Sequence, residues 1–211
     1  KLIKKLMENF VNQNSVVREI WGKSDTILFI FAGASAEFAL NKAVDWLFYT
    51  GKLPRDPLGR LFSTVTYARE IVFASSSQAI RAIKNINAIH ASVEKSRGKA
   101  IPDWAYRDVL FMLIDYSIRS YEVLERPLTK AEKKEVFEVF TRVGEKMKLK
   151  DLPTTFDQYE IMRKKHLEQD LRFGEFSHQL YKQYRKHLGW LRYRLLIETQ
   201  EIGRASCRER V

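Results

Sequence analysis

The amino-acid sequence predicts an all-α protein that forms a single domain of packed helices. Turn signals are few, because only 9 of the 211 residues are glycine and 5 are proline. Segments rich in Ala, Leu, Lys, Glu and Arg repeat apolar residues at three- and four-residue steps, which is the period of a helix. The 45% hydrophobic content supplies a sizeable core, and no stretch resembles a linker that would divide the chain.

The first 40 residues predict two helical regions. Residues 1–11 carry apolar side chains at four-residue steps between lysines, which predicts an amphipathic helix. Residues 27–40 form the most apolar run of the chain, yet this run contains Glu37 and is shorter than the roughly 20 apolar residues that a membrane-spanning helix requires. We therefore expect a buried helix pair in this region.

A turn region over residues 49–57 separates this part of the chain from the next helix. It contains Gly51 and two prolines, so we expect a helix to begin close to Leu58. Arg60 and Thr64 lie four residues apart in this helix and therefore share one of its faces.

A second helix should follow directly, because the serines at 75–77 offer side chains for its N-cap. Its apolar positions are spaced at helical steps and comprise Ile80, Ile83 and Ile86. His90 takes the next position of this series. We expect its imidazole to continue the buried stripe of the helix.

Capping residues mark the helices in the middle of the chain. Pro102 suits the first turn of a helix over residues 103–124, whose wholly apolar centre predicts a place in the middle of the bundle. Thr129 followed by Glu132 is a capping box that opens a helix over residues 130–147. Three further helical segments complete the prediction: one that ends at 171, and two over 175–188 and 190–200.

The charge of the chain admits several kinds of partner. Its formal net charge is +11, which is compatible with nucleic acid, a phospholipid surface or the propionates of a haem. The basic residues are interleaved with acidic ones, and no run of five or six like charges occurs. Since no nucleic-acid-binding module is recognisable, a solvated basic surface is the simpler interpretation.

The histidines are the most informative candidates for chemistry, because the motifs of P-loop, zinc-protease, EF-hand and α/β-hydrolase sites are missing from the sequence. The Glu-x-x-His spacing of a di-iron bundle occurs once, at Glu175 and His178, and one occurrence does not favour such a centre. His166, His178 and His187 stand among Lys, Arg and Gln, so we interpret them as surface residues. His90 lies on an Ile-lined face, where an imidazole is either a hydrogen-bonded core residue or an iron ligand.

Arg60 and Thr64 also admit two interpretations. A guanidinium offers a planar fork of donors and threonine a hydroxyl, which could pair with a haem propionate or hold bound dioxygen. Alternatively, the two residues are an ordinary i,i+4 pair on the surface of a helix. Their spacing alone does not decide between these interpretations.

The last stretch of the chain, residues 201–211, resembles the translation of a sequencing-adapter read-through. We therefore expect the natural sequence to stop at Gln200, which leaves residues 1–200 as one helical domain truncated at its C-terminus. The only cysteine, Cys207, lies in this stretch. On this interpretation the rest of the chain excludes disulfides, thiolate ligation of haem and Cys-based zinc sites.

Six segments of the chain, taken in their order and spacing, form one specific pattern: FAGASAEFAL (31–40), PLGRLFSTVTYAREIVFAS (57–75), INAIHASV (86–93), YSIRSYEVLERPLTKAEKKEVFEVF (116–140), LKDLP (149–153) and LYKQYRKHLGWLRYRLLIETQ (180–200). This pattern resembles the catalytic domain shared by the MpaB-type oxygenases and the rubber oxygenases, also called latex clearing proteins. The later segments are closer to the MpaB branch.

The resemblance implies an all-α, globin-like helical fold, a b-type haem, and dioxygen-dependent cleavage of a carbon–carbon double bond in an isoprenoid chain. His90 falls where the family keeps its proximal haem histidine, the ligand of the iron. Arg60 and Thr64 fall on an Arg-x-x-Lys-Thr motif near the distal side, where Arg60 would also contact the cofactor. Ser63 stands where the rubber oxygenases have the lysine, so this chain lacks that cationic distal partner.

The leading hypothesis is therefore a haem-dependent oxygenase that acts on dioxygen and on an apolar small-molecule or polyprenyl substrate. The alternative is a non-catalytic helical protein of the same fold that binds haem or a lipid. A basic nucleic-acid binder is the third and least favoured hypothesis. Basic surface residues would also allow peripheral association with a membrane, in which lipophilic substrates dissolve.

Overall fold

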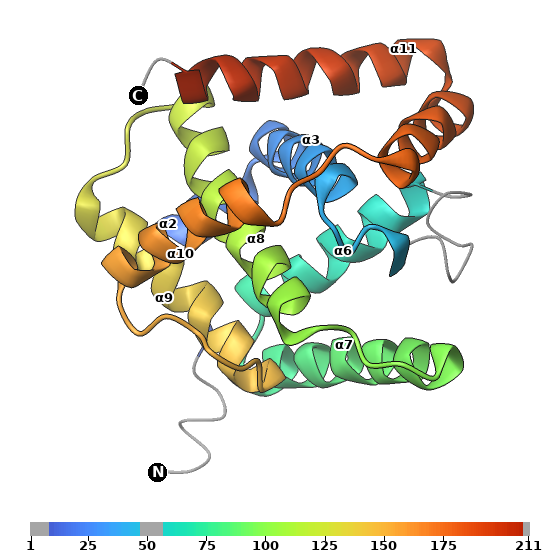
Figure 1. Cartoon of the computed structure of the whole chain (residues 1–211). Coiled ribbons are helices and arrows are strands. Elements are labelled where there is room, and N and C mark those ends of the chain that lie inside the picture. Colours follow the sequence, from blue (N-terminus) through green and yellow to red (C-terminus); the bar gives the residue numbers. More distant parts are fainter. Residues whose placement is uncertain (1–8, 47–56, 209–211) are drawn as a thin grey trace.

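A computed structural model describes residues 9–46 and 57–208, and this part of the chain folds into helices alone (Figure 1). Its elements, in chain order, are α2 (Val16–Gly22), α3 (Ser24–Leu40), α6 (Pro57–Val72), α7 (Ser76–Arg97), α8 (Asp103–Leu124), α9 (Lys130–Met147), α10 (Phe156–Gln169) and α11 (Glu175–Arg208). Extended pairing among the described residues is limited to isolated bridges, Asn9 with Ser75 and Asn41 with Leu171. The prediction of an all-α, single-domain bundle is confirmed.

The central layer of the bundle consists of α3 and α8, which pack against each other. Helices α2, α9 and α10 cover α8 on one side, and α11 lies across α3 (Figure 1). Trp21 of α2 is 1% exposed and donates a hydrogen bond from Nε1 to Ser117 Oγ of α8, at 3.1 Å. This bond satisfies the one polar atom of an otherwise apolar side chain in the core.

Local capping signals fixed several helix boundaries as predicted. Ser75 caps α7 and Thr129 caps α9, each through a reciprocal capping box. Helix α8 spans the predicted residues, with Pro102 at its N-cap position rather than inside the first turn. Of the predicted apolar centre of α8, residues 110–112 and 114 are buried, while Val109 is 39% exposed.

Two predictions for the first 40 residues differ from the structure. Residues 27–40 belong to one continuous helix, α3, and not to a helix pair, because no residue between 24 and 40 interrupts the helical hydrogen bonding. The helix predicted over residues 1–11 falls mostly outside the described residues. Its last two positions, Phe10 and Val11, are not helical, and both pack into the core.

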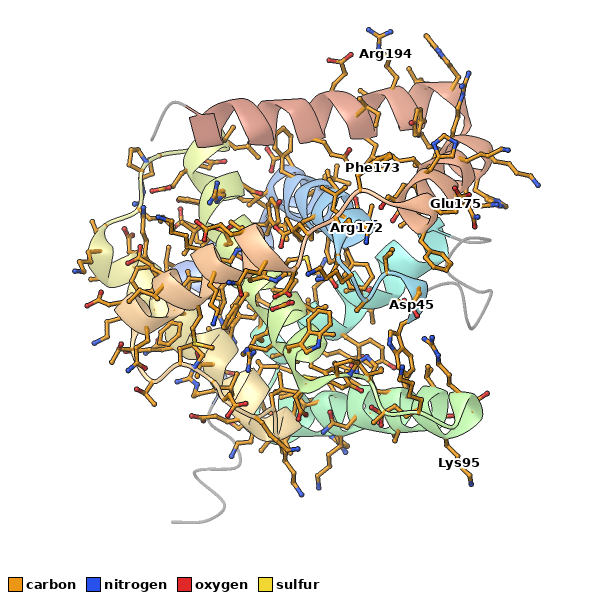
Figure 2. The ribbon with its side chains drawn as sticks, viewed as in Figure 1. Asp45, Lys95, Arg172, Phe173, Glu175 and Arg194 are labelled. Atoms are coloured by element: carbon orange, nitrogen blue, oxygen red, sulfur yellow. The ribbon has the colours of Figure 1, made fainter. Side chains whose placement is uncertain are left out.

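The last helix, α11, is divided at Gly189, as the two predicted segments require. Gly189 has φ 73° and ψ 170°, a conformation that glycine adopts without steric cost. The second segment crosses α3, where Gln200 donates a hydrogen bond from Nε2 to the Ala32 carbonyl oxygen at 3.2 Å. Arg194 lies on the outer side of this segment (Figure 2).

A close approach between α3 and α8 depends on Gly33. A Cβ atom at this position would overlap the ring of Tyr116, which packs against the main core cluster. We expect Gly33→Ala to lower the free energy of unfolding by about 1–3 kcal/mol, as overpacking of a dense core does. Urea denaturation followed by circular dichroism measures this change.

Gly174 provides the matched control for this substitution, because a Cβ atom there would meet nothing within 4 Å. Gly174→Ala should change the free energy of unfolding by less than about 0.5 kcal/mol. Equal effects of the two substitutions would contradict the close packing of α3 on α8.

Within the described part of the chain, no helix combines the length and the apolar character needed to cross a bilayer.

Candidate functional site

His90 lies on α7, one helical turn beyond an apolar cluster that joins α6, α7 and α9. The buried members of this cluster are Ile71, Ala82, Ile83 and Val143. The His90 side chain is half-buried, so it ends the stripe rather than continuing it at full burial. Its ring meets the ring of Tyr106 on α8 edge-on, with centroids 5.1 Å apart and an interplanar angle of 68°.

A hollow of about 190 Å³ lies beside His90, at the meeting point of α7, α8 and the end of α9. Its lining comprises Asn87, His90, Ala91, Glu94, Asp103, Tyr106, Met147, Lys148 and Leu149. Glu94 Oε1 accepts hydrogen bonds from the Tyr106 hydroxyl at 3.2 Å and from the Ile101 amide at 2.8 Å. Burial, together with the neighbouring Glu94 carboxylate, raises the pKa of Tyr106, so its hydroxyl stays a donor.

Thr64 lies on α6, one turn before the residues that contact α7. It is half-buried and precedes Tyr67 and Ile71, which pack against Ile83 and the stripe of α7. Thr64 and His90 therefore extend the two facing sides of this helix pair. Figure 1 shows α6 and α7 diverging away from the turn that joins them.

Arg60 lies one turn before Thr64 in α6, and its side chain falls outside the described residues. Ser63 is exposed, on a different side of α6 from Thr64. Thr64 is not among the described residues that line the hollow beside His90, so the predicted roles of both Arg60 and Thr64 stay predictions.

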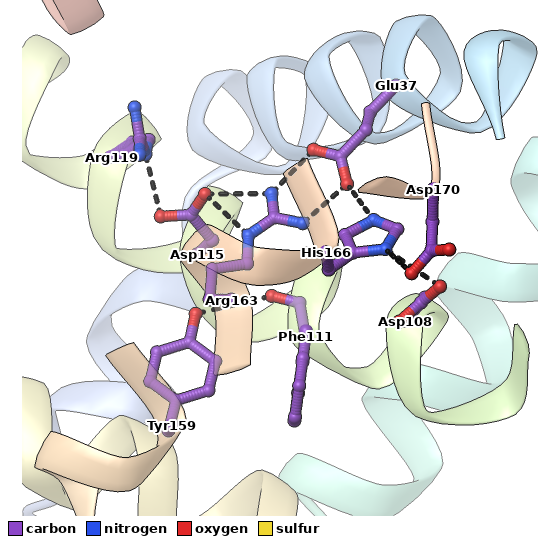
Figure 3. A network of polar contacts seen from close by, with 9 residues as sticks. All are labelled: Glu37, Asp108, Phe111, Asp115, Arg119, Tyr159, Arg163, His166 and Asp170. Carbon is purple, nitrogen blue, oxygen red and sulfur yellow. Dashed lines mark hydrogen bonds and ion pairs between the residues drawn. The ribbon is translucent and has the colours of Figure 1, made fainter. Parts of the chain in front are cut away.

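A second polar cluster, which we call the charge network, is buried between α3, α8 and α10 (Figure 3). Arg163 of α10, 5% exposed, is its centre. The guanidinium donates from Nη1 and Nη2 to the two carboxylate oxygens of Glu37, each at 2.5 Å. It also donates from Nε and Nη2 to Asp115 Oδ2, at 3.1 and 2.8 Å. One planar fork therefore bridges carboxylates from α3 and α8.

Helical spacing places the members of the charge network on facing surfaces. Asp108 and Asp115 are seven residues apart on α8, which puts both on one face, and Arg163 and His166 are three residues apart on α10. Asp115 also accepts a hydrogen bond from Arg119 Nε at 2.6 Å, one turn further along α8. The charged side chains of α8 and α10 therefore lie opposite one another along the two helices.

His166 is 3% exposed, so the prediction that it is a surface residue is wrong. Its Nε2 atom lies 3.1 Å from Glu37 Oε1. Its Nδ1 atom lies 2.8 Å from Asp108 Oδ2 and 3.4 Å from Asp170 Oδ2. The other two histidines predicted at the surface, His178 and His187, are exposed as expected.

The charge network is ionised at neutral pH. Burial alone would raise the pKa of Glu37, but the hydrogen bonds from His166 and Arg163 outweigh it and hold this pKa at about 2. Burial would likewise lower the pKa of His166, yet the Asp108 and Glu37 carboxylates raise it to about 9. Each charge is thus stabilised by opposite charges rather than by water.

The sequence does contain a signal for this cluster. Glu37 interrupts the most apolar run of the chain, and Asp108 and Asp115 recur within the apolar helix α8. Ionised side chains at buried positions require partners of opposite charge. This signal indicates that cationic partners exist, but it does not say which of the many Lys, Arg and His residues they are.

The fold defines an all-α protein, and the half-buried His90 is a candidate cofactor ligand beside a hollow between α7, α8 and the end of α9. The family model described as the ER-bound oxygenase mpaB/B′/rubber oxygenase catalytic domain matches residues 21–208. The chain therefore belongs to this family of oxygenase catalytic domains. No curated protein and no solved structure matches the chain.

The described residues can be tested against the haem that the family resemblance implies. An imidazole at the edge of an apolar stripe suits an iron ligand, and His90 has this position. The hollow beside it, about 190 Å³, is smaller than the roughly 300–1,000 Å³ of ligand pockets. The position of His90 therefore suits a ligand of the haem iron. The hollow that the described residues line does not by itself enclose the haem macrocycle.

Proposed function

We propose that the chain is a haem-dependent oxygenase that cleaves or oxidises a carbon–carbon double bond of an apolar, isoprenoid-like substrate. In this proposal His90 is the proximal ligand of the iron of haem b. The single observation that carries the proposal is the position of His90, in a chain of this oxygenase family, at the end of the apolar stripe of α7.

In this proposal three side chains have separate roles around the cofactor. His90 holds the iron and, through its edge contact with Tyr106, keeps a fixed ring orientation. Arg60 and Thr64 supply a guanidinium and a hydroxyl that bind a propionate or orient dioxygen. The alkene would contact the apolar members of the lining of the hollow, Ala91, Met147 and Leu149. When bound, the haem supplies the activation of dioxygen, whose two atoms end in the two carbonyl products of scission.

Ser63 bears on the choice of substrate. The rubber oxygenases carry a lysine at this position of the motif, and serine provides no cation there. We therefore propose a substrate other than rubber, and this departure also supports the non-catalytic haem- or lipid-binding alternative.

Peripheral association with a membrane forms part of the proposal. Trp190, Leu191 and Leu195 of α11 are 71%, 63% and 59% exposed, and arginines at 192 and 194 lie among them. Apolar side chains beside cations suit the interface of an anionic bilayer. Co-sedimentation with anionic vesicles but not with neutral ones is the expected result, and no co-sedimentation with either would refute this part.

The proposal is tested by adding haem to the purified chain and recording its absorption spectrum. We expect one haem per chain with a Soret band, and uptake of dioxygen when a polyprenyl or terpenoid alkene is supplied. A chain that stays colourless after haem addition would refute the proposal. Bound haem without dioxygen uptake for any such alkene would establish the non-catalytic alternative instead.

A further inference from the structure

Three side chains of the charge network point their ligand atoms at one another near the end of α10. Asp108 comes from α8, His166 from α10, and Asp170 from the residue that follows α10 (Figure 3). We propose that Asp108, His166 and Asp170 bind a divalent first-row transition metal ion. This site is separate from the proposed haem site, and it does not depend on that proposal.

The distances between the candidate ligand atoms suit a coordination sphere. His166 Nδ1 lies 2.8 Å from Asp108 Oδ2 and 3.4 Å from Asp170 Oδ2, and all three atoms lie within 4.8 Å of one another. Ligand atoms that bind a metal at 2.0–2.2 Å are about 3–3.5 Å apart. One imidazole nitrogen with two carboxylate oxygens is a donor set for manganese, iron or zinc rather than for a copper(I) ion.

Glu37 fixes the ring orientation of His166, which favours metal binding at Nδ1. Its Oε1 atom lies 3.1 Å from Nε2, the ring nitrogen on the far side from the two aspartates. A metal-binding histidine commonly donates its second N–H to a carboxylate, which fixes the tautomer and the ring orientation. Arg163 holds Glu37 in place through two hydrogen bonds. A metal ion at the aspartates would therefore replace the proton on Nδ1, while Glu37 keeps the proton on Nε2.

Asp108 supplies a second observation. Its side chain is 2% exposed, and its Oδ2 atom forms an ion pair with His166 but no hydrogen bond of good geometry with any described residue. A buried carboxylate oxygen without a donor is costly unless a cation binds it. This oxygen is the one that lies 2.8 Å from Nδ1, so it points into the proposed site.

The charges around the site also favour a divalent cation. Four carboxylates, those of Glu37, Asp108, Asp115 and Asp170, face three cations, Arg119, Arg163 and the His166 imidazolium. These charges sum to −1, and a divalent ion that replaces the Nδ1 proton of His166 would bring the sum to zero.

Access to the site is through Asp170, whose side chain is 32% exposed. The Asp170 backbone is fixed in place, because its carbonyl oxygen accepts a hydrogen bond from the Lys42 amide at 3.0 Å and Leu171 bridges to Asn41. The ion would therefore link α8 to α10 next to the end of α3, with one side open to solvent.

The metal site and the His90 hollow lie on different sides of α8. Tyr106 borders the hollow and Asp108 belongs to the metal site. Side chains two residues apart leave a helix about 200° from each other. A metal bound at Asp108 therefore does not contact a ligand of His90.

Equilibrium dialysis of the full chain against Mn²⁺, after treatment with a chelator, tests the proposal. We expect one Mn²⁺ per chain, counted by mass spectrometry, and a dissociation constant at least about tenfold higher for Asp170→Asn. Asp157→Asn removes an exposed carboxylate from the same helix and should bind Mn²⁺ like the unmodified chain. Manganese is counted directly, so the result is independent of haem.

Thermal unfolding of the unmodified chain gives a second readout, because an ion that binds only the folded site raises Tm. His178→Gln combined with His187→Gln should leave Mn²⁺ binding unchanged. The proposal is overturned if the unmodified chain neither binds Mn²⁺ nor gains Tm, if Asp170→Asn binds it equally well, or if the exposed histidines account for the binding.

Discussion

Replacing Arg163 with methionine is expected to lower the free energy of unfolding by about 3–5 kcal/mol. The substitution retains an unbranched apolar stem but removes the guanidinium that binds Glu37 and Asp115. Glu37 is 4% exposed, so its carboxylate would stay ionised without a partner or take up a proton at a cost. Urea denaturation measures the change.

Arg194 offers the control for this prediction. It pairs with Glu198 on α11 at 2.9 Å, with side-chain exposures of 65% and 50%. Arg194→Met should cost less than about 0.5 kcal/mol, since solvent screens an exposed i,i+4 pair. Combining Glu37→Gln with Arg163→Met should recover part of the loss, because it removes one of the stranded charges. Equal losses for Arg163→Met and Arg194→Met would show that the charge network does not stabilise the fold.

Replacing His90 with alanine is expected to abolish the Soret band of the haem-loaded protein. The proposed proximal ligand is then lost, and Tyr106, its neighbour in the hollow, retains a proton that disfavours iron binding. His90 is half-buried at the end of a stripe, so the helical circular dichroism spectrum should persist. Absorption spectroscopy after haem addition and gel filtration measures the retained cofactor.

His178→Ala is the matched control, because His178 is an exposed histidine on α11. Its absorption spectrum should equal that of the unmodified chain. Retention of the Soret band by His90→Ala, or its loss in His178→Ala, would show that the iron ligand lies elsewhere.

Sequence patterns predicted those features of the fold that depend on neighbouring residues. The capping boxes at Ser75 and Thr129 and the break at Gly189 are local, and each marks a helix end in the structure. The helix pair expected at residues 27–40 is a single helix, α3, in the structure, because nothing in this apolar run ends a helix. Once packed between α8 and α11, it needs no amphipathic face.

The charge network was missed because its partners are distant in the sequence. His166 has Lys164, Lys165 and Glu168 nearby, so local composition indicates a solvated helix. Its burial results from Glu37 and Asp108, which reach it from two other helices. Only the three-dimensional packing of α10 on α8 reveals which charged residues are paired.

The separation between Glu37 and Arg163 has a consequence for the order in which the protein is made. The two residues are 126 positions apart, so a ribosome that adds about 5–20 residues per second needs roughly 6–25 s to produce the partner of Glu37. During this interval α3 exists without α10, and burial of its carboxylate would be costly. We therefore expect α3 to stay hydrated in the nascent chain until α10 has emerged. The core would then close late in synthesis.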